Sequence, residues 1–188
     1  MIRIGLIGEI GSGKTYVSKC FGYPIFNADR EVKKIYKTNK QCFRKLKKKF
    51  PNQIKNFPII KSQIKEIINK KNIKVLSKIV HPYVRSNLKK FLKKNNKCKY
   101  TVLDIPLLLE NKLHKKNDIL IFVKTPSKTI VNRLKKRGNY NKKIINILKS
   151  QQIKKNKKIK LCNYVIDNSL IKNNILKQIK QIKKELND

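Results

Sequence analysis

Short apolar runs recur along the chain and predict a set of buried strands. In the first run, residues 2–7, apolar positions alternate with others and then become continuous, which is typical of a strand in a parallel sheet. Similar runs predict strands at residues 24–26, 100–105, 119–123 and 164–166. Helical stretches separate these runs, and the alternation predicts an α/β fold with a parallel sheet of about five strands flanked by helices.

The stretch between residues 30 and 100 has a different pattern, with apolar residues at helical spacing. Ile64 and Ile67 belong to one apolar stripe. A second stripe, after Pro82, begins at Val84 and repeats every three or four residues. No run in this stretch predicts a strand, so we expect a helical insert within the α/β core.

One segment near the N-terminus carries a chemical pattern. Residues 8–15 read GEIGSGKT and match the phosphate-binding loop G-x-x-x-x-G-K-S/T. A predicted strand precedes the loop and a predicted helix follows it, so that backbone amides and the helix N-terminus converge on phosphate oxygens. Lys14 would reach the β- and γ-phosphates of a nucleoside triphosphate, and the Thr15 hydroxyl would bind Mg²⁺. The predicted nucleotide-binding residues are Gly8, Glu9, Ile10, Gly11, Ser12, Gly13, Lys14 and Thr15.

Acidic residues follow two predicted strands, at the edge of the sheet where ligands of such folds bind. Asp29 is a candidate base for a substrate hydroxyl or a metal ligand; the alternative is a cap of the helix at residues 30–37. Asp104 is a candidate Mg²⁺ ligand acting through water, or a polar strand end without chemistry. Glu110 follows three leucines and fits a solvent-facing cap as well as a site residue.

Arginine is rare in this chain, since only six of the 49 basic residues are arginine. Lysine would serve wherever charge alone is needed, so the arginines are candidates for tasks that need a planar, bidentate donor. Arg133 and Arg137 are one helical turn apart and share a face, which suits a clamp on a phosphoryl group. A salt-bridged surface pair is the alternative. His81 stands alone in the helical insert, where a histidine is more often structural.

The net charge of +39 raises the question of a nucleic-acid partner. Lysine, asparagine and isoleucine are all abundant here and share A/T-rich codons, and the lysines are spread along the whole chain. We therefore attribute the excess to mutational bias and expect no specific nucleic-acid partner. The positive field would still attract anionic ligands such as nucleotides.

The remaining composition argues against several other classes of protein. The four cysteines are far apart and the two histidines are not neighbours, so zinc spacing is absent and we expect reduced thiols. No apolar run approaches the roughly 18–20 residues of a membrane span, and the glycine loop follows Met1 too closely for a secretory signal. We expect a cytoplasmic monomer without a membrane partner.

Seven segments, in order along the chain, resemble the dephospho-CoA kinase family. Among them, the PLL-x-E motif at residues 106–110 is quite particular to that family. The segments are GLIGEIGSGKTYVS, FNADREVKKIY, IVHPYVR, LDIPLLLEN, VNRLKKRGN, ILKSQQ and NYVIDNS.

The resemblance implies the fold and the reaction of that family. The reaction is ATP-dependent phosphorylation of the ribose 3′-hydroxyl of dephospho-CoA, with Mg²⁺, to give coenzyme A and ADP in the final step of CoA biosynthesis. The fold is a single P-loop kinase domain. Its expected parts are a core at about 1–29, 100–138 and 161–188, a helical CoA-binding insert at about 30–99 and a lid at about 139–160.

The resemblance also implies roles for individual residues. Asp29 would be the base on the 3′-hydroxyl, and Lys14 and Arg137 would act on the transferred phosphoryl group. Arg133 is the second choice for that task, and both arginines would bind ATP. The implied substrate-binding residues are Asp29, His81, Pro106 and Glu110, and the implied metal-binding residues are Thr15 and Asp104.

The sequence departs from the family pattern at several positions. Glu9 replaces a usual glycine in the loop, and Asn27 stands where the family usually has an aspartate, which would weaken Mg²⁺ binding. Lysines at residues 154–160 stand where the family tends to have arginine. Two other functions remain open at this point: another nucleotide or nucleoside kinase, and a basic RNA-binding protein with a vestigial loop.

Overall fold

The computed structural model describes residues 1–69, 71–136, 141–169 and 172–187. It divides into two compact units. The first consists of Met1–Asn27 and Asn95–Asp188 and is called the sheet unit here. The second consists of Ala28–Lys94 and is called the helical unit.

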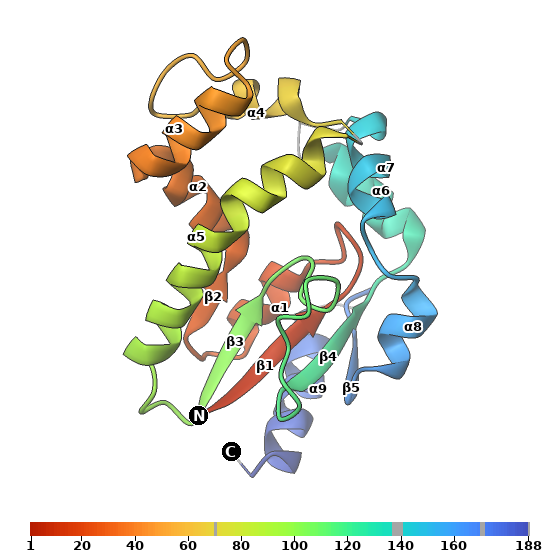
Figure 1. Cartoon of the computed structure of the whole chain (residues 1–188). Helices are drawn as coiled ribbons and strands as arrows, with labels where there is room; N and C mark the ends of the chain where they lie inside the picture. The colour runs from red at the N-terminus through yellow and green to blue at the C-terminus, as the bar shows by residue number, and fades with distance from the viewer. Residues whose placement is uncertain (70, 137–140, 170–171, 188) are drawn as a thin grey trace. The chain divides into compact units, whose positions relative to one another are not determined.

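The sheet unit is built on five parallel strands in the order β2-β3-β1-β4-β5 (Figure 1). The strands are β1 (Ile2–Ile7), β2 (Ile25–Asn27), β3 (Tyr100–Asp104), β4 (Ile119–Lys124) and β5 (Tyr164–Asp167). Every apolar run that predicted a strand forms one, and the predicted parallel sheet is confirmed. The pairing register sets Asn27 beside Asp104 and Lys124 beside Asp167, so the carboxyl ends of the strands share one edge.

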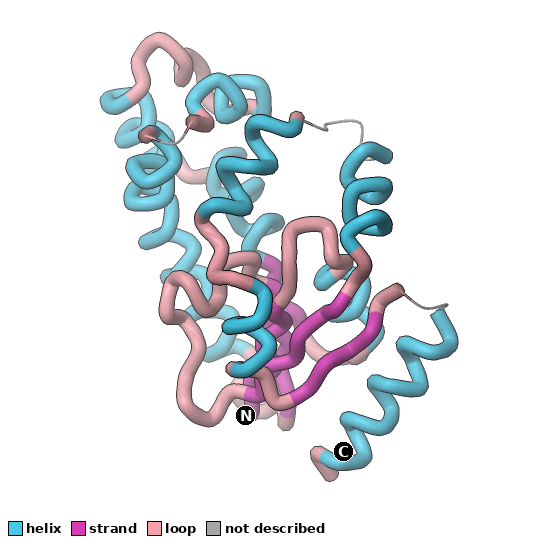
Figure 2. The backbone as a smooth tube through the Cα atoms, turned by 90° about the vertical axis from the view of Figure 1, so that its right-hand side faces the viewer, coloured by secondary structure: helices cyan, strands magenta, loops and turns pink. Residues whose placement is uncertain are grey.

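The helices of the sheet unit are α1 (Lys14–Cys20), α6 (Ser127–Lys136), α7 (Lys142–Ser150), α8 (Lys155–Lys160) and α9 (Lys172–Glu185). The central strands β1, β3 and β4 are buried on both faces, so they need helices packed on each side. Helices α1 and α9 cover one face, and α9 lies along the flank of the sheet that ends in β5 (Figure 2). Residues buried there include Ile4, Leu6, Val17, Phe21, Val102, Ile121, Ile166, Ile175, Ile179 and Ile182.

A buried ion pair joins the start of β1 to the loop before β4. The Arg3 guanidinium donates from Nε to Asp118 Oδ1 at 2.7 Å and from Nη2 to Asp118 Oδ2. Asp118 also accepts from the backbone amide of Lys115 at 2.8 Å. Arg3 therefore has the planar, bidentate task expected for an arginine in this chain, but the task is structural.

The helical unit contains α2 (Ala28–Thr38), α3 (Lys40–Lys49), α4 (Lys61–Ile67) and α5 (Asn72–Lys94). Helix α5 packs against α2 and α3. The stripe after Pro82 is buried as its spacing predicts, with Val84 8% and Leu88 6% exposed. Between α5 and α2, Asn87 Nδ2 donates to Glu31 Oε2 at 2.7 Å. Pro82 lies within α5, where it lacks the amide that would continue the helical hydrogen-bond ladder.

The part of the expected lid that the structure describes, residues 141–160, contains two helices. Helix α7 ends at Ser150, and α8 begins at Lys155 after an extended residue, Lys154. The amide of Ile153 donates to the Glu110 carboxylate instead of to a helical carbonyl, which ends the ladder between the two helices. Across the ranges that the structure describes, no helix is both long and apolar enough to cross a membrane.

Candidate active site

The loop at residues 8–13 runs from the carboxyl end of β1 to the N-terminus of α1, as the motif predicts. Gly13 is the N-cap of α1 and provides no capping side chain, so the first amides of the helix are not satisfied by a cap. Within the loop, the Ser12 amide donates to the Glu9 carbonyl at 3.1 Å. The loop therefore combines a compact backbone turn with the positive end of a helix, which suits an anion.

Gly13 has a backbone conformation and surroundings that exclude a side chain. Its φ is +88°, in the left-handed region that residues with a Cβ rarely adopt. A Cβ at this position would lie 2.2 Å from Asn168 Nδ2 and 3.2 Å from Arg133 Nη1. Gly22 is also left-handed, with φ +73°, but a Cβ there would meet nothing within 4 Å. A substitution at Gly22 therefore adds backbone strain alone, whereas the same substitution at Gly13 adds strain and also a steric clash.

We expect Gly13→Ala to weaken nucleotide binding by tenfold or more, whereas Gly22→Ala should leave it unchanged. Both variants should lose about 1–2 kcal/mol of unfolding free energy from left-handed strain. Gly13→Ala should lose about 1 kcal/mol more, because Asn168 must move away from the loop. Urea unfolding and calorimetric nucleotide titration measure the two effects. Equal stability losses together with equal affinities would contradict a role for the space at Gly13.

Lys14 folds back over the loop. Its Nζ donates to the carbonyl oxygens of Gly8 at 3.1 Å and Glu9 at 3.0 Å, and the residue is only 8% exposed. A buried ammonium group with carbonyl partners is tolerated, but it interacts more strongly with an anion. The geometry keeps the Lys14 charge at the loop, where the motif predicts a phosphate.

Asp104 brings together the residues predicted to hold the metal. The carboxylate is buried, and its Oδ2 accepts from Thr15 Oγ1 at 2.6 Å and from Asn27 Nδ2 at 2.5 Å. The three residues come from α1, β2 and β3, at the edge of the sheet shared by the strand ends. Hydroxyl and carboxylate oxygens at this separation fit Mg²⁺, which uses few protein ligands beside phosphates and water. Among the described residues, no group of three or more histidine, cysteine or acidic side chains forms an alternative metal site.

The Ser12 carbonyl is an anchor for the whole loop. It accepts from Asn168 Nδ2 at 2.6 Å, from Thr125 Oγ1 at 2.9 Å and from Arg133 Nη1 at 3.3 Å. Arg133 Nη2 also donates to the Asn168 carbonyl at 3.0 Å. The alternative of a salt-bridged surface residue therefore does not describe Arg133, which donates to two backbone carbonyl oxygens.

Two of these anchoring residues were not singled out from the sequence. Thr125 and Asn168 follow β4 and β5, and each is buried. Their only sequence signal is a polar residue directly after an apolar strand, at the edge where parallel strands end. That signal also marks many residues without a role, so it does not distinguish these two.

Pro106 and Glu110, predicted to bind substrate, contact the segment between α7 and α8 in the structure. Glu110 Oε1 accepts from Lys158 Nζ at 2.8 Å and from the Ile153 amide at 3.0 Å. The Pro106 carbonyl accepts a long hydrogen bond of 3.5 Å from Gln152 Nε2. Glu110 is thus an internal partner of a lysine, and the idea that it is a solvent-facing cap is wrong.

The helical unit carries the other two predicted site residues. Asp29 lies within the first turn of α2, one residue after Ala28 begins the helix, so it is not the cap of a helix at residues 30–37. His81 is half-buried in α5. Burial lowers the pKa of His81, and the nearby Arg85 charge lowers it further, which favours the neutral imidazole. Arg137 lies outside the described residues.

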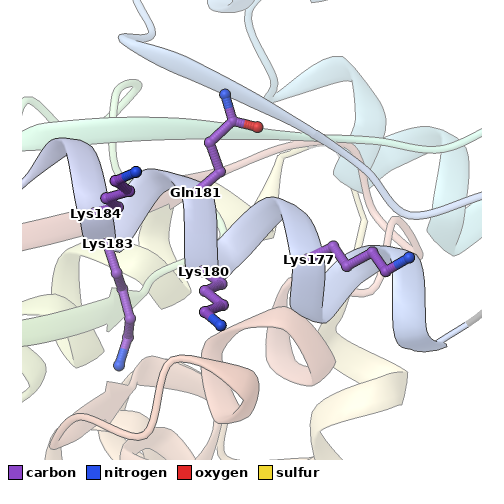
Figure 3. Close-up of a pocket in the computed structure, with 5 residues that line it drawn as sticks. All are labelled: Lys177, Lys180, Gln181, Lys183 and Lys184. Carbon is purple, nitrogen blue, oxygen red and sulfur yellow. The ribbon is translucent and has the colours of Figure 1, made fainter.

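A shallow depression on α9 is unrelated to the loop. It is lined by Lys177, Lys180, Gln181, Lys183 and Lys184 (Figure 3). All five residues belong to one helix, and none comes from a strand end or from the phosphate-binding loop. A row of lysines on one helix face provides charge without a shaped binding site, as expected if the lysine excess reflects composition.

The loop, the parallel sheet and the strand-end cluster together define a kinase of the P-loop class. A model of the dephospho-CoA kinase family matches residues 2–174. The dephospho-CoA kinase of Wolbachia pipientis wMel is 34% identical over an alignment of 191 positions. The alignment covers 98% of this chain and 97% of that protein. The chain belongs to the dephospho-CoA kinase family.

Solved structures agree with the fold. A protein of Thermus thermophilus is 26% identical and superposes with a TM-score of 0.79, covering 98% of this chain and 97% of that chain. Dephospho-CoA kinase from Campylobacter jejuni is 21% identical with a TM-score of 0.63, covering 98% and 96%. The predicted P-loop kinase fold is confirmed.

Proposed function

We propose that this chain transfers the γ-phosphoryl group of ATP to the ribose 3′-hydroxyl of dephospho-CoA, forming coenzyme A and ADP. The observation that carries the proposal is the family match over residues 2–174 of a chain whose phosphate-binding loop is intact. ATP and dephospho-CoA are then the small-molecule partners. Such substrates favour a cytoplasmic location, and we expect a monomer.

Residues of the loop would bind and orient the triphosphate. Loop amides and the Lys14 ammonium would neutralise the β- and γ-phosphates, which lowers the cost of charge in the transition state. The Ser12 hydroxyl is buried and has no hydrogen-bond partner among the described residues, and a phosphate oxygen would supply one. These donors are held in place by Thr125, Arg133 and Asn168 through the Ser12 carbonyl.

Thr15 and Asp104 would hold Mg²⁺, Thr15 through its hydroxyl and Asp104 through water. Held by these two residues, Mg²⁺ would supply positive charge that offsets the charge of the phosphates. Asn27 offers a neutral amide beside Asp104, so of the three residues Thr15, Asn27 and Asp104 one supplies a carboxylate. Mg²⁺ binding would therefore depend more on the phosphates of ATP here than at a site with two protein carboxylates.

Asp29 would accept the proton of the 3′-hydroxyl. It is the first acidic residue after β2 and lies in the first turn of α2. His81 and the rest of the helical insert at about 30–99 would hold dephospho-CoA. Arg137 would contact the transferred phosphoryl group from a lid at about 139–160.

Dephospho-CoA-dependent consumption of ATP by the purified protein tests the proposal. We expect turnover with dephospho-CoA and Mg²⁺, and none above background with AMP, CMP or nucleosides as acceptor. Mass spectrometry of the product should show one added phosphate. ATP consumption with a nucleotide or nucleoside but not with dephospho-CoA would overturn the proposal in favour of another kinase.

Restoring a carboxylate at residue 27 should change metal binding. Asn27→Asp places two carboxylates in hydrogen-bond range of each other, so without Mg²⁺ they repel each other. We expect Tm without Mg²⁺ to fall by about 2–4 °C, equivalent to 1 kcal/mol in a domain of this size. Mg²⁺ should bind more tightly in the absence of nucleotide, as measured by calorimetry.

The matched control is Asn163→Asp, which adds the same charge in the sheet unit. The Asn163 side-chain oxygen accepts from the Leu120 amide at 2.8 Å, and aspartate preserves that acceptor. This variant should not tighten Mg²⁺ binding. If both variants raise Mg²⁺ affinity equally, the effect belongs to net charge and not to the cluster at Asp104.

A further inference from the structure

Lys158 is an exception among the lysines of this chain. It is 1% exposed, whereas its neighbours in α8, Lys155, Lys157 and Lys160, are exposed. Taking an ammonium group out of water costs several kcal/mol unless a close counter-charge compensates. Glu110 is that counter-charge, with Lys158 Nζ 2.8 Å from Glu110 Oε1.

Glu110 also binds the backbone that links α7 to α8. The same oxygen that pairs with Lys158 accepts from the Ile153 amide at 3.0 Å. Next to it, Gln152 reaches the Pro106 carbonyl. Residues 152–158 are therefore fastened at three points to residues 106–110, the stretch that directly follows the end of β3 at Asp104.

Helix α7 is packed less tightly than the stretch that follows it. None of its residues, Lys142–Ser150, is fully buried, and its apolar residues Ile144, Ile145, Ile147 and Leu148 are half-buried. Its C-terminus joins the fastened stretch at Gln151 and Gln152. The placement of α7 therefore depends on residues 152–158, which follow its C-terminus and form its base.

We propose that Glu110 is a positioning residue: paired with Lys158, its carboxylate fixes the base of α7 to the chain that follows Asp104. This contact gives Glu110 a task other than binding dephospho-CoA. Loss of this anchor should also reduce ATP turnover. That expectation rests on the proposed function, in which α7 belongs to the lid at about 139–160. The anchoring itself concerns the protein without any substrate.

The test replaces both members of the pair by apolar residues of similar size, Glu110→Leu with Lys158→Met. A buried ion pair replaced in this way often keeps or gains stability, so Tm should stay within a few degrees of the parent. Amide hydrogen exchange of residues 142–153 in the substrate-free protein should become about tenfold faster. The value of kcat/KM for ATP should fall by about tenfold.

A second buried ion pair, between Arg3 and Asp118, provides the control. The double variant Arg3→Met with Asp118→Leu removes this ion pair. The hydrogen bonds of the pair join β1 to the loop before β4 and do not involve α7 or residues 106–110. This variant should leave exchange of residues 142–153 at the parent rate. If the Glu110 and Lys158 double variant also exchanges at the parent rate, the positioning role is overturned.

A single variant covers the case in which the double variant does not fold. Glu110→Gln keeps an acceptor for Ile153 but leaves Lys158 without its counter-charge, and exchange in α7 should rise in a folded protein. Parent-like exchange in Glu110→Gln would overturn the proposal. Because exchange needs no substrate, it tests the anchor even if the parent fails to phosphorylate dephospho-CoA, an outcome that would overturn only the proposed function.

Discussion

Replacing Lys14 with methionine is expected to reduce kcat by about 10²–10³-fold, the range for loss of one preorganised charge-stabilising donor. Methionine fills a similar volume, so the buried stem of Lys14 keeps its packing. The ammonium group that contacts the Gly8 and Glu9 carbonyls is lost, and with it the charge that we propose for binding the phosphates. Because the loose transition state shifts negative charge toward the leaving ADP oxygen, the Lys14 ammonium would stabilise it more than bound ATP, and kcat should fall more than ATP affinity.

Steady-state kinetics with ATP and dephospho-CoA measure this loss, and calorimetry measures ATP affinity. Lys19→Met is the matched control, since Lys19 lies in the same helix and is exposed. It removes one charge from the protein without touching the loop. A comparable fall in kcat for both variants would assign the effect to the overall positive field and contradict the role of Lys14.

Replacing Asp29 with asparagine is expected to lower kcat by about 10²–10⁴-fold, the usual contribution of a general base. Asparagine has nearly the same shape and still accepts hydrogen bonds, but it cannot take the proton of the 3′-hydroxyl. The loop and its anchors lie in the sheet unit and are unchanged, so ATP should bind within about threefold of the parent affinity. The variant thus separates binding from chemistry.

The control for Asp29 is Glu31→Gln, two residues along α2. Glu31 accepts a hydrogen bond from Asn87, which glutamine preserves, and the same negative charge is removed. We expect near-parent turnover from this control. Near-parent turnover in Asp29→Asn would refute the base role, and the proposed acceptor chemistry would then need another proton acceptor.

Elements decided by local sequence could be predicted well. Each strand is a short apolar run, and the loop motif requires a strand before it and a helix after it, so β1, the loop and α1 follow from neighbouring residues. Thr15 and Asp104 could be paired in advance because both occupy the carboxyl edge of a parallel sheet. The structure places their side-chain oxygens 2.6 Å apart.

Contacts between distant segments could not be predicted in this way. Thr125 and Asn168 lie 113 and 156 residues from Ser12, and nothing in their local sequence marks them as partners of its carbonyl. Lys158 was hidden for a different reason. The sequence around Lys158 contains several lysines, and nothing in that local sequence distinguishes the buried lysine from the exposed ones.

Arg133 donates hydrogen bonds to two different carbonyl oxygens, and this limits which substitutions the chain can accept at that position during evolution. A single base change turns some arginine codons into lysine codons, and A/T bias favours that change. A lysine at this position would offer one nitrogen in place of the two terminal nitrogens with which Arg133 donates to the Ser12 and Asn168 carbonyls. Selection would then act against the mutational pressure at this codon, whereas arginines in solvent could be exchanged for lysine at little cost.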